Sequence, residues 1–184
     1  MAKSWIKNVK DKGELTVFNG AGAWQAIVTA AMVSFNKQGF GVTLKSTKEK
    51  ETANVVVGLS GGSSSFDYMD TEWPVVFDAA KYHGKTLVFV DPDQDGVMKA
   101  AVFLPANLEK VSNDVKKVVT VHEFIHAAGM NENSDHDKYS GIFYGKFNEQ
   151  SGKLIEIIMT KGALPMPPIR LGPDTLSAVR ALWS

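Results

Sequence analysis

The sequence predicts an α+β or mixed α/β fold, on three observations. An alternating run at residues 14–19 predicts a short strand, and apolar residues at helical spacing follow it. Several apolar, β-branched runs come next, as expected for buried strands. A second helical pattern precedes a mixed C-terminal part. This order is typical of domains in which helices pack against a mixed sheet.

The first helix is expected where apolar residues recur one and two turns apart, and Gly39 stands where its C-terminal cap would be. Its apolar stripe consists of Trp24, Ile27, Val28, Ala31, Met32 and Phe35. Further strands are expected at 41–46, 53–59, 85–90 and 99–104. The Gly/Ser-rich run 58–65 is expected to form a flexible loop.

The C-terminal part combines a predicted hairpin with a final helix. Runs 141–148 and 154–160 flank a polar turn, which predicts two paired strands. Pro173 favours a helix start, because its missing N–H costs nothing in the first turn. The helix at 174–183 is expected to place Leu176, Val179 and Trp183 on one face.

Composition excludes several classes of protein. The 184 residues suffice for one domain with a real core, so the chain needs no disulfide or metal to fold. Lys plus Arg equals Asp plus Glu at 20 each, so no global field attracts nucleic acid or an anionic membrane. Without cysteine, a metal site must use His, Asp or Glu.

Location is left open by the sequence. The N-terminus lacks the apolar core of a signal peptide, and no run approaches the ~18 apolar residues of a membrane span. The protein is therefore expected to be cytoplasmic at synthesis, to be exported by another route, or to have lost a leader.

Three of the four histidines fall within fifteen residues, and two of them form an H-E-x-x-H motif, His122-Glu123-Phe124-Ile125-His126. A helix is expected here, beginning after a cap at Ser112 or Asn113. Histidines one helical turn apart can bind one zinc ion, and Glu123 can then act as general base on a water molecule. Two histidines packed in an ordinary helix are the alternative, although burying both without partners is costly.

The motif continues to Gly129, and H-E-x-x-H-x-x-G resembles the metzincin clan of zinc metallopeptidases. In that clan the glycine lets the chain leave the helix so that a third ligand reaches the metal. The usual third position is occupied here by Glu132, and His136 stands four residues later. We favour His136, because zinc sites prefer imidazole, with Glu132 as the alternative.

Two further features are similar in order to metzincins. The clan has a methionine beneath the metal before a final helix; Met166 is the candidate for it and Met159 the alternative, with ordinary core packing equally consistent. The clan also has an edge strand that binds substrate by strand addition. The strand before the active-site helix is the candidate, with Ala100, Ala101, Val102 and Phe103 as its residues. An ordinary core strand is the alternative, and it is favoured for any single one of these residues.

The resemblance implies a mixed, mostly parallel sheet with a long N-terminal helix, an active-site helix and a small C-terminal subdomain ending in a helix. The domain would be a single catalytic unit, 1–184, with an upper subdomain 1–129 and a lower subdomain 130–184. A second metal is less well supported: 91–96 matches the start of a calcium loop, but Val102 stands where the loop needs a bidentate Glu. An Asp/Gly turn between strands is the better interpretation there.

The leading functional hypothesis is a zinc endopeptidase that acts on a peptide or protein substrate. Its zinc ligands would be His122, His126 and His136, and Glu123 would be its base. The sequence shows no propeptide and no cysteine for latency, which favours restricted specificity, a separate protein inhibitor as partner, or activity only after delivery. The alternatives are a metzincin-like binding or structural protein that keeps its zinc, and a zinc amidase acting on a non-protein amide.

Overall fold

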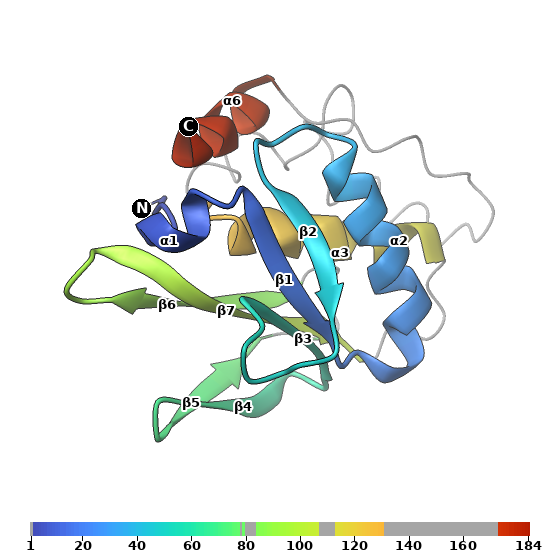
Figure 1. The fold of residues 1–184 in the computed structure, drawn as a ribbon. Helices are drawn as coiled ribbons and strands as arrows, with labels where there is room; N and C mark the ends of the chain where they lie inside the picture. The colour runs from blue at the N-terminus through green and yellow to red at the C-terminus, as the bar shows by residue number, and fades with distance from the viewer. Residues whose placement is uncertain (1, 78, 80–83, 107–112, 131–172) are drawn as a thin grey trace.

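The computed structural model describes residues 2–77, 79, 84–106, 113–130 and 173–184 (Figure 1). A strand and a helix are followed by a run of strands and a second long helix, as the sequence patterns predict. In chain order they are α1 (Lys7–Lys10), β1 (Glu14–Asn19), the 3₁₀ turn η1 (Gly22–Trp24), α2 (Gln25–Asn36), β2 (Thr43–Thr47), β3 (Val55–Ser60), β4 (Ser63–Tyr68), β5 (Thr71–Val76), β6 (Lys85–Asp91), β7 (Gly96–Pro105), α3 (Asn113–Ala127) and α6 (Pro173–Trp183).

The described strands form one five-stranded sheet, in the order β2-β1-β3-β7-β6, and a separate β4–β5 hairpin. Strands β2, β1, β3 and β7 are parallel to their neighbours, whereas β6 runs antiparallel to β7. The predicted mixed α/β fold with a mostly parallel sheet is therefore confirmed.

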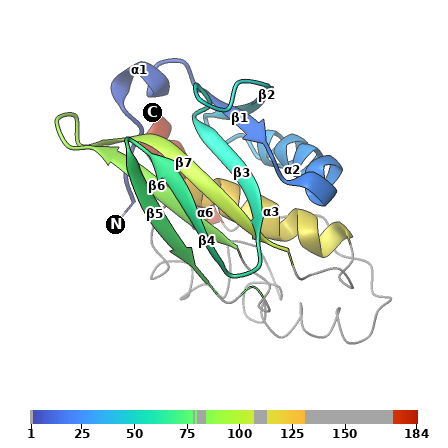
Figure 2. The ribbon, with the colours of Figure 1, turned by 90° about the horizontal axis from the view of Figure 1, so that it is seen from below.

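Alternate side chains of the central strands point to opposite faces of the sheet, because side chains of a strand alternate with a period of two. On one face Val55, Val57 and Val102 pack in a cluster with Phe35 of α2 and Phe124 of α3. On the other face Val56, Ala101 and Phe103 pack with Phe66 and Val75 of the hairpin. Figure 2 shows the sheet with the helices on one side and the hairpin on the other. Helix α3 packs over β7 and β6, toward one side of the sheet.

Two expectations about local structure were wrong. The long N-terminal helix is not seen: the N-terminal region has α1 with four residues and α2 with 12. The loop expected at 58–65 is largely strand, because Gly58–Ser60 end β3 and Ser63–Ser65 begin β4. Gly62 has φ +110° at the turn between these strands, a conformation that favours glycine.

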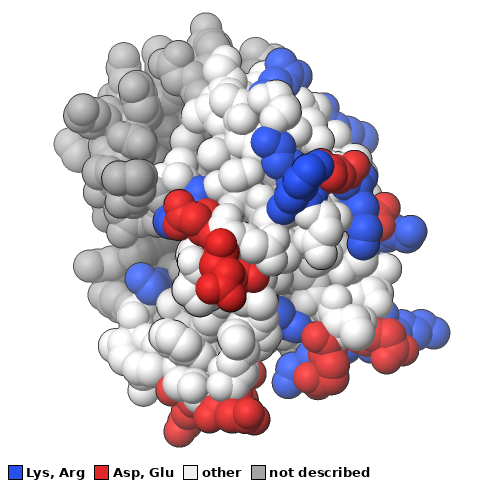
Figure 3. Space-filling view, turned by 60° about the vertical axis from the view of Figure 1, so that its left-hand side comes forward, with Lys and Arg blue, Asp and Glu red and all other residues white. Residues whose placement is uncertain are grey.

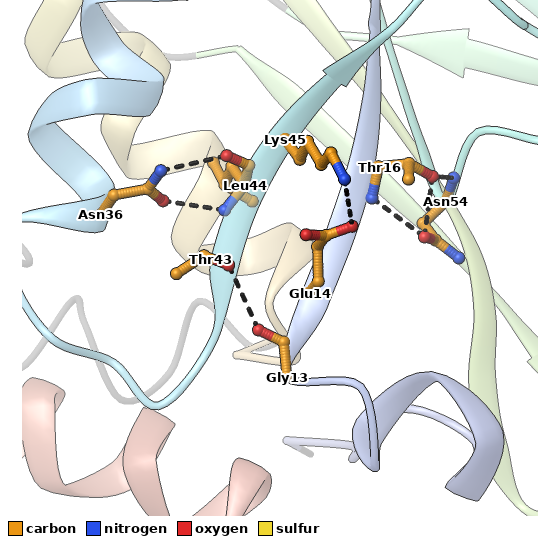
Figure 4. A network of polar contacts seen from close by, with 8 residues as sticks. All are labelled: Gly13, Glu14, Thr16, Asn36, Thr43, Leu44, Lys45 and Asn54. Atoms are coloured by element: carbon orange, nitrogen blue, oxygen red, sulfur yellow. Dashed lines mark hydrogen bonds and ion pairs between the residues drawn. The ribbon is translucent and has the colours of Figure 1, made fainter.

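The outer edge of β2 is covered by a side chain of α2 (Figure 4). The Asn36 amide donates to the Leu44 carbonyl at 3.0 Å and accepts from the Leu44 N–H at 2.8 Å. On the inner side, Thr16 and Asn54 exchange hydrogen bonds of 2.8–3.0 Å between β1 and the residue before β3. Because Asn36 occupies backbone groups that another strand would need, this edge is a poor docking site for a peptide.

Charged side chains of both signs lie in small groups on the face shown in Figure 3. This distribution agrees with the zero net charge of the chain. Substrate capture by a single-sign field is therefore not expected from this face. Among the described helices, none has the length and apolar character needed to cross a membrane.

Lys99 is buried in β7, with 6% of its surface exposed. Its ammonium group donates to the carbonyls of Lys50 and Glu51, at 3.3 and 2.9 Å, and lies 5.7 Å from the ring centroid of Tyr68. Burial lowers the pKa of Lys99; the charge of Glu51 opposes this shift and that of Lys50 adds to it. The folded protein therefore releases this proton at a lower pH than the unfolded chain does.

We expect this shift to appear as a pH-dependent difference between wild type and Lys99→Met. Between the lowered pKa and the unfolded value of about 10.4, the unfolded chain binds more protons, so the stability contribution of Lys99 rises with pH. Urea unfolding from roughly pH 8 to 10.5 should show the free energy of unfolding of the wild type rising relative to the variant. A constant or falling difference would contradict the shift.

Candidate metal and active site

The helix predicted to carry the H-E-x-x-H motif is observed as α3, which begins at Asn113 and ends at Ala127. Its apolar side chains Val121, Phe124 and Ile125 are fully buried, so they fix the rotation of the helix about its axis. With that rotation His122 and His126 lie on the same face, one turn apart. Their Nε2 atoms are 3.1 Å apart, and their ring centroids 4.8 Å apart. The helix thus brings together two of the three expected zinc ligands.

The Nε2 separation fits a shared zinc ion. Two imidazole nitrogens that bind one tetrahedral zinc at about 2 Å stand about 3.4 Å apart. The observed 3.1 Å is close to that value, and a small rotation of either ring makes up the difference. The His122 side chain keeps 18% of its surface exposed, so solvent reaches the pair from its side.

The orientation of His126 is set by the chain that follows the helix. Its Nδ1 contacts the carbonyl oxygen of Met130, which can only accept, so Nδ1 carries the proton. In the neutral ring Nε2 then has a lone pair, as a metal ligand requires. Burial lowers the pKa of His126, the Met130 hydrogen bond opposes this shift and the charge of Lys85 adds to it. The neutral form that binds metals is favoured.

Glu123 lies beside the histidine pair and is 2% exposed. Its Oε1 accepts from the Gly84 N–H at 3.0 Å and lies 4.0 Å from His122 Nε2. Its Oε2 accepts from the Thr86 hydroxyl at 2.7 Å. The carboxylate is therefore held close to the nitrogens that would bind zinc.

The C-terminal end of α3 is held by both ends of the chain. The Trp5 indole N–H donates to the Ala127 carbonyl and the Trp183 indole N–H to the Ala128 carbonyl, each at 2.9 Å. These bonds satisfy two of the carbonyls that the end of a helix leaves without intrahelical partners. The Lys3 N–H donates to the Gly129 carbonyl at 2.9 Å. The position from which the chain leaves the helix is thereby fixed.

Gly129 has φ +119°, which confirms the expectation that this glycine turns the chain out of the helix. A Cβ atom at this position would lie 2.4 Å from the Lys3 carbonyl oxygen and 3.0 Å from Leu182 Cδ1. Both the backbone angle and the space therefore require glycine here.

Several predicted site residues lie outside the described residues. They are His136 and its alternative Glu132, Met166 and its alternative Met159, and the strands expected at 141–148 and 154–160. Within the described part of the chain, no group of three or more His, Cys, Asp or Glu side chains is placed to hold a metal ion. The final helix is described: α6 begins at Pro173, and Val179 and Trp183 are buried, as expected.

The edge-strand assignment was wrong. Ala100, Ala101, Val102 and Phe103 lie in β7, which pairs with β3 on one side and with β6 on the other. They have no open backbone edge on which a peptide could dock, and they serve as core residues instead. Among the described strands, β6 is the outermost on this side of the sheet, and its second residue, Thr86, contacts Glu123.

The acidic run 91–96 forms the turn between β6 and β7, as the better interpretation predicted. Asp91 Oδ1 accepts from the backbone N–H groups of Asp93 and Gln94, and Oδ2 accepts from the Gln94 amide at 2.8 Å. The Asp95 carboxylate contacts the Lys3 ammonium group. These carboxylates stabilise the turn, and a calcium role is not needed to explain them.

Gly84 and Thr86 were not identified from the sequence. They stand 39 and 37 residues before Glu123, and only the pairing of β6 with β7 and the packing of α3 bring them to it. The sequence offers one weak indication, a glycine just before a predicted strand, which is a place where a backbone can approach another group closely.

Comparisons with known proteins give limited information. No family model matches the chain, and no curated protein matches it. One solved structure of myroilysin is 13% identical, with a TM-score of 0.44, over 93% of this chain and 83% of that one. A second myroilysin structure is 14% identical, with a TM-score of 0.42, over 92% of both chains. Similarity at this level carries no argument about activity, so the interpretation of the site rests on its own geometry.

Proposed function

We propose that the chain is a zinc-dependent endopeptidase of metzincin-like type. The observation that carries this proposal is the juxtaposition of His122 and His126, with Nε2 atoms 3.1 Å apart, and a buried carboxylate whose Oε1 lies 4.0 Å from His122 Nε2. Two imidazoles and a neighbouring acid that does not itself ligate are the parts that metal-assisted hydrolysis needs. A site that only supported folding would not require the acid.

His122 and His126 would hold the zinc through Nε2, with His136 as the third ligand and Glu132 as the alternative. The donor set suits zinc, because neutral imidazoles and carboxylates are its usual ligands in the absence of cysteine. The third ligand would come from the lower subdomain, 130–184, and complete a single catalytic domain.

Bound zinc would polarise the scissile carbonyl and lower the pKa of a water molecule. Glu123 would accept the proton of the attacking water through Oε1 and pass it to the leaving amine. The hydrogen bonds from Gly84 and Thr86 would hold the carboxylate at the right angle during both transfers.

Substrate would dock along β6, the outermost described strand on that side of the sheet. An extended peptide can add to such an edge through backbone hydrogen bonds. Thr86 lies in β6 and contacts Glu123, so a peptide paired with the start of β6 would pass beside the base. The other end of the sheet is less suitable, because Asn36 occupies the edge of β2.

Cleavage of a mixed peptide library tests the function. The protein would be assayed after zinc loading, after chelation and dialysis, and after zinc is restored. We expect internal peptide bonds to be cut only in the zinc-containing samples. Zinc binding without cleavage would favour a binding or structural protein, and hydrolysis of non-protein amides alone would favour an amidase; either result overturns the endopeptidase proposal.

The third ligand can be tested separately. We expect His136→Ala to weaken zinc binding by on the order of 100-fold, because even changes next to a metal ligand cost 10–100-fold. The measurement is a competition titration with a chromogenic chelator, with Glu132→Ala in parallel. Unchanged zinc affinity in His136→Ala together with weakened binding in Glu132→Ala would transfer the role to Glu132.

A further inference from the structure

The geometry points to Thr86 as a positioning residue for Glu123. The inference deepens the proposed function and rests on it, because Glu123 is the base in that proposal. Thr86 donates its hydroxyl to Glu123 Oε2 at 2.7 Å, a short contact of the charge-assisted kind. The Thr86 hydroxyl oxygen also lies 3.2 Å from the backbone carbonyl oxygen of Glu123, so it contacts both the side chain and the backbone of Glu123.

Each oxygen of the Glu123 carboxylate accepts a hydrogen bond from a different donor. While Thr86 binds Oε2, the Gly84 N–H binds Oε1 at 3.0 Å, and the two donors together determine the plane of the carboxylate. Gly84 also limits the space around it: a Cβ there would lie 3.1 Å from Glu123 Cγ and 2.3 Å from the Phe103 carbonyl oxygen. Glu123 therefore has little freedom to turn as long as Thr86 keeps its hydroxyl.

Thr86 lies in the strand that is proposed to bind the substrate, so it connects that strand to Glu123. Thr86 is the second residue of β6, and β6 alternates its side chains between the two faces of the sheet. Val88 packs in the cluster on the helix side, whereas Leu87 and Phe89 pack on the hairpin side. Thr86 thus faces α3 from the same strand that would pair with the peptide. A shift of β6 on substrate docking would be transmitted to the base through one hydrogen bond.

The test compares Thr86→Val, which keeps the shape but removes the hydroxyl, with Thr86→Ser, which keeps the hydroxyl. We expect Thr86→Val to lower kcat by about 10–100-fold, with KM within about two-fold of wild type and zinc content unchanged. Thr86→Ser should stay within about three-fold of the wild-type kcat. Thr43→Val is the matched control. The hydroxyl of Thr43, in β2, also donates to a carbonyl, that of Gly13 at 3.3 Å, but it lies far from the candidate site.

A second measurement does not depend on activity. In urea unfolding of the metal-free protein, Thr86→Val should raise the equilibrium constant for unfolding by about 10-fold or more in the wild-type background. In the Glu123→Ala background, Thr86→Val should change the equilibrium constant for unfolding by less than about two-fold, because the carboxylate that the hydroxyl binds is absent. Thr86→Ala replaces Thr86→Val in both measurements if the valine variant does not fold.

The outcomes separate this inference from the proposed function. The positioning role would be overturned if Thr86→Val kept the wild-type kcat, or if Thr86→Val and Thr86→Ser lowered kcat equally. It would also be overturned if Thr86→Val changed the equilibrium constant for unfolding equally in the wild-type and Glu123→Ala backgrounds. If the wild type has no zinc-dependent hydrolysis at all, the proposed function fails, and the unfolding measurement still decides whether Thr86 holds Glu123.

Discussion

Replacing Glu123 by glutamine is expected to lower kcat for peptide hydrolysis by about 10²–10⁴-fold, the usual contribution of a general base. Glutamine has nearly the same shape, and its amide oxygen can accept from Gly84 or Thr86. Its NH₂ group cannot take a proton from water. Steady-state kinetics on a fluorogenic peptide selected from the cleaved library measures the loss.

Two controls accompany this variant. Zinc content should equal that of wild type, because Glu123 is not a ligand in the proposed site. Glu72→Gln makes the same chemical change on an exposed residue of β5 and should leave kcat unchanged. A Glu123→Gln protein with wild-type kcat and normal zinc content would eliminate Glu123 as the base.

Gly129→Ala is expected to have the largest effect on stability. The residue has φ +119°, and its added Cβ would lie 2.4 Å from the Lys3 carbonyl oxygen. Backbone strain of this kind costs about 1–3 kcal/mol and overpacking against a fixed backbone about 1–3 kcal/mol more. Together they predict a loss of about 2–6 kcal/mol in the free energy of unfolding, measured by urea denaturation.

The effect should extend to the metal site. The hydrogen bond from Lys3 to Gly129 fixes the exit of the chain from α3, and the next residue, Met130, orients His126. Gly129→Ala should therefore also weaken zinc binding. Gly61→Ala is the matched control, because a Cβ there meets nothing within 4 Å. A Gly129→Ala protein as stable as Gly61→Ala would contradict the structural role of this glycine.

Elements with strong periodicity could be predicted from the sequence. The apolar stripe of α2 and the β-branched run of β3 correspond to structure within a few residues. The β4–β5 hairpin was missed, because its strands carry Ser63, Ser64, Ser65 and Pro74, which local propensity assigns to loops. These strands are stabilised by tertiary packing of Phe66 and Val75 on the sheet.

The position of the edge strand could not be predicted, for a different reason. Order along the sequence favours the strand directly before α3 as the edge, but strand order in a sheet depends on which strands pair after folding. The hairpin connection through 91–96 places β6 outside β7, so the edge of the described sheet lies one strand earlier in the sequence. No local pattern in either strand distinguishes these two arrangements.

Some residues of the candidate site could be predicted from local sequence spacing, whereas others could not. The spacing of His122, Glu123 and His126 is set by helix geometry, so their juxtaposition could be predicted from five consecutive residues. The contacts from Gly84, Thr86, Trp5 and Trp183 cross 37 to 122 residues of sequence and depend on the packed fold. These distant residues hold α3 and the Glu123 carboxylate in place, and they could be found only from the structure.

The most direct test of the central claim is the zinc content of the purified protein under metal-replete conditions, measured by elemental analysis. The proposed site predicts about one zinc per chain in wild type, and less than about half of that in His122→Ala and in His126→Ala after dialysis. Less than about one zinc per two wild-type chains, or full zinc content in both histidine variants, would contradict it.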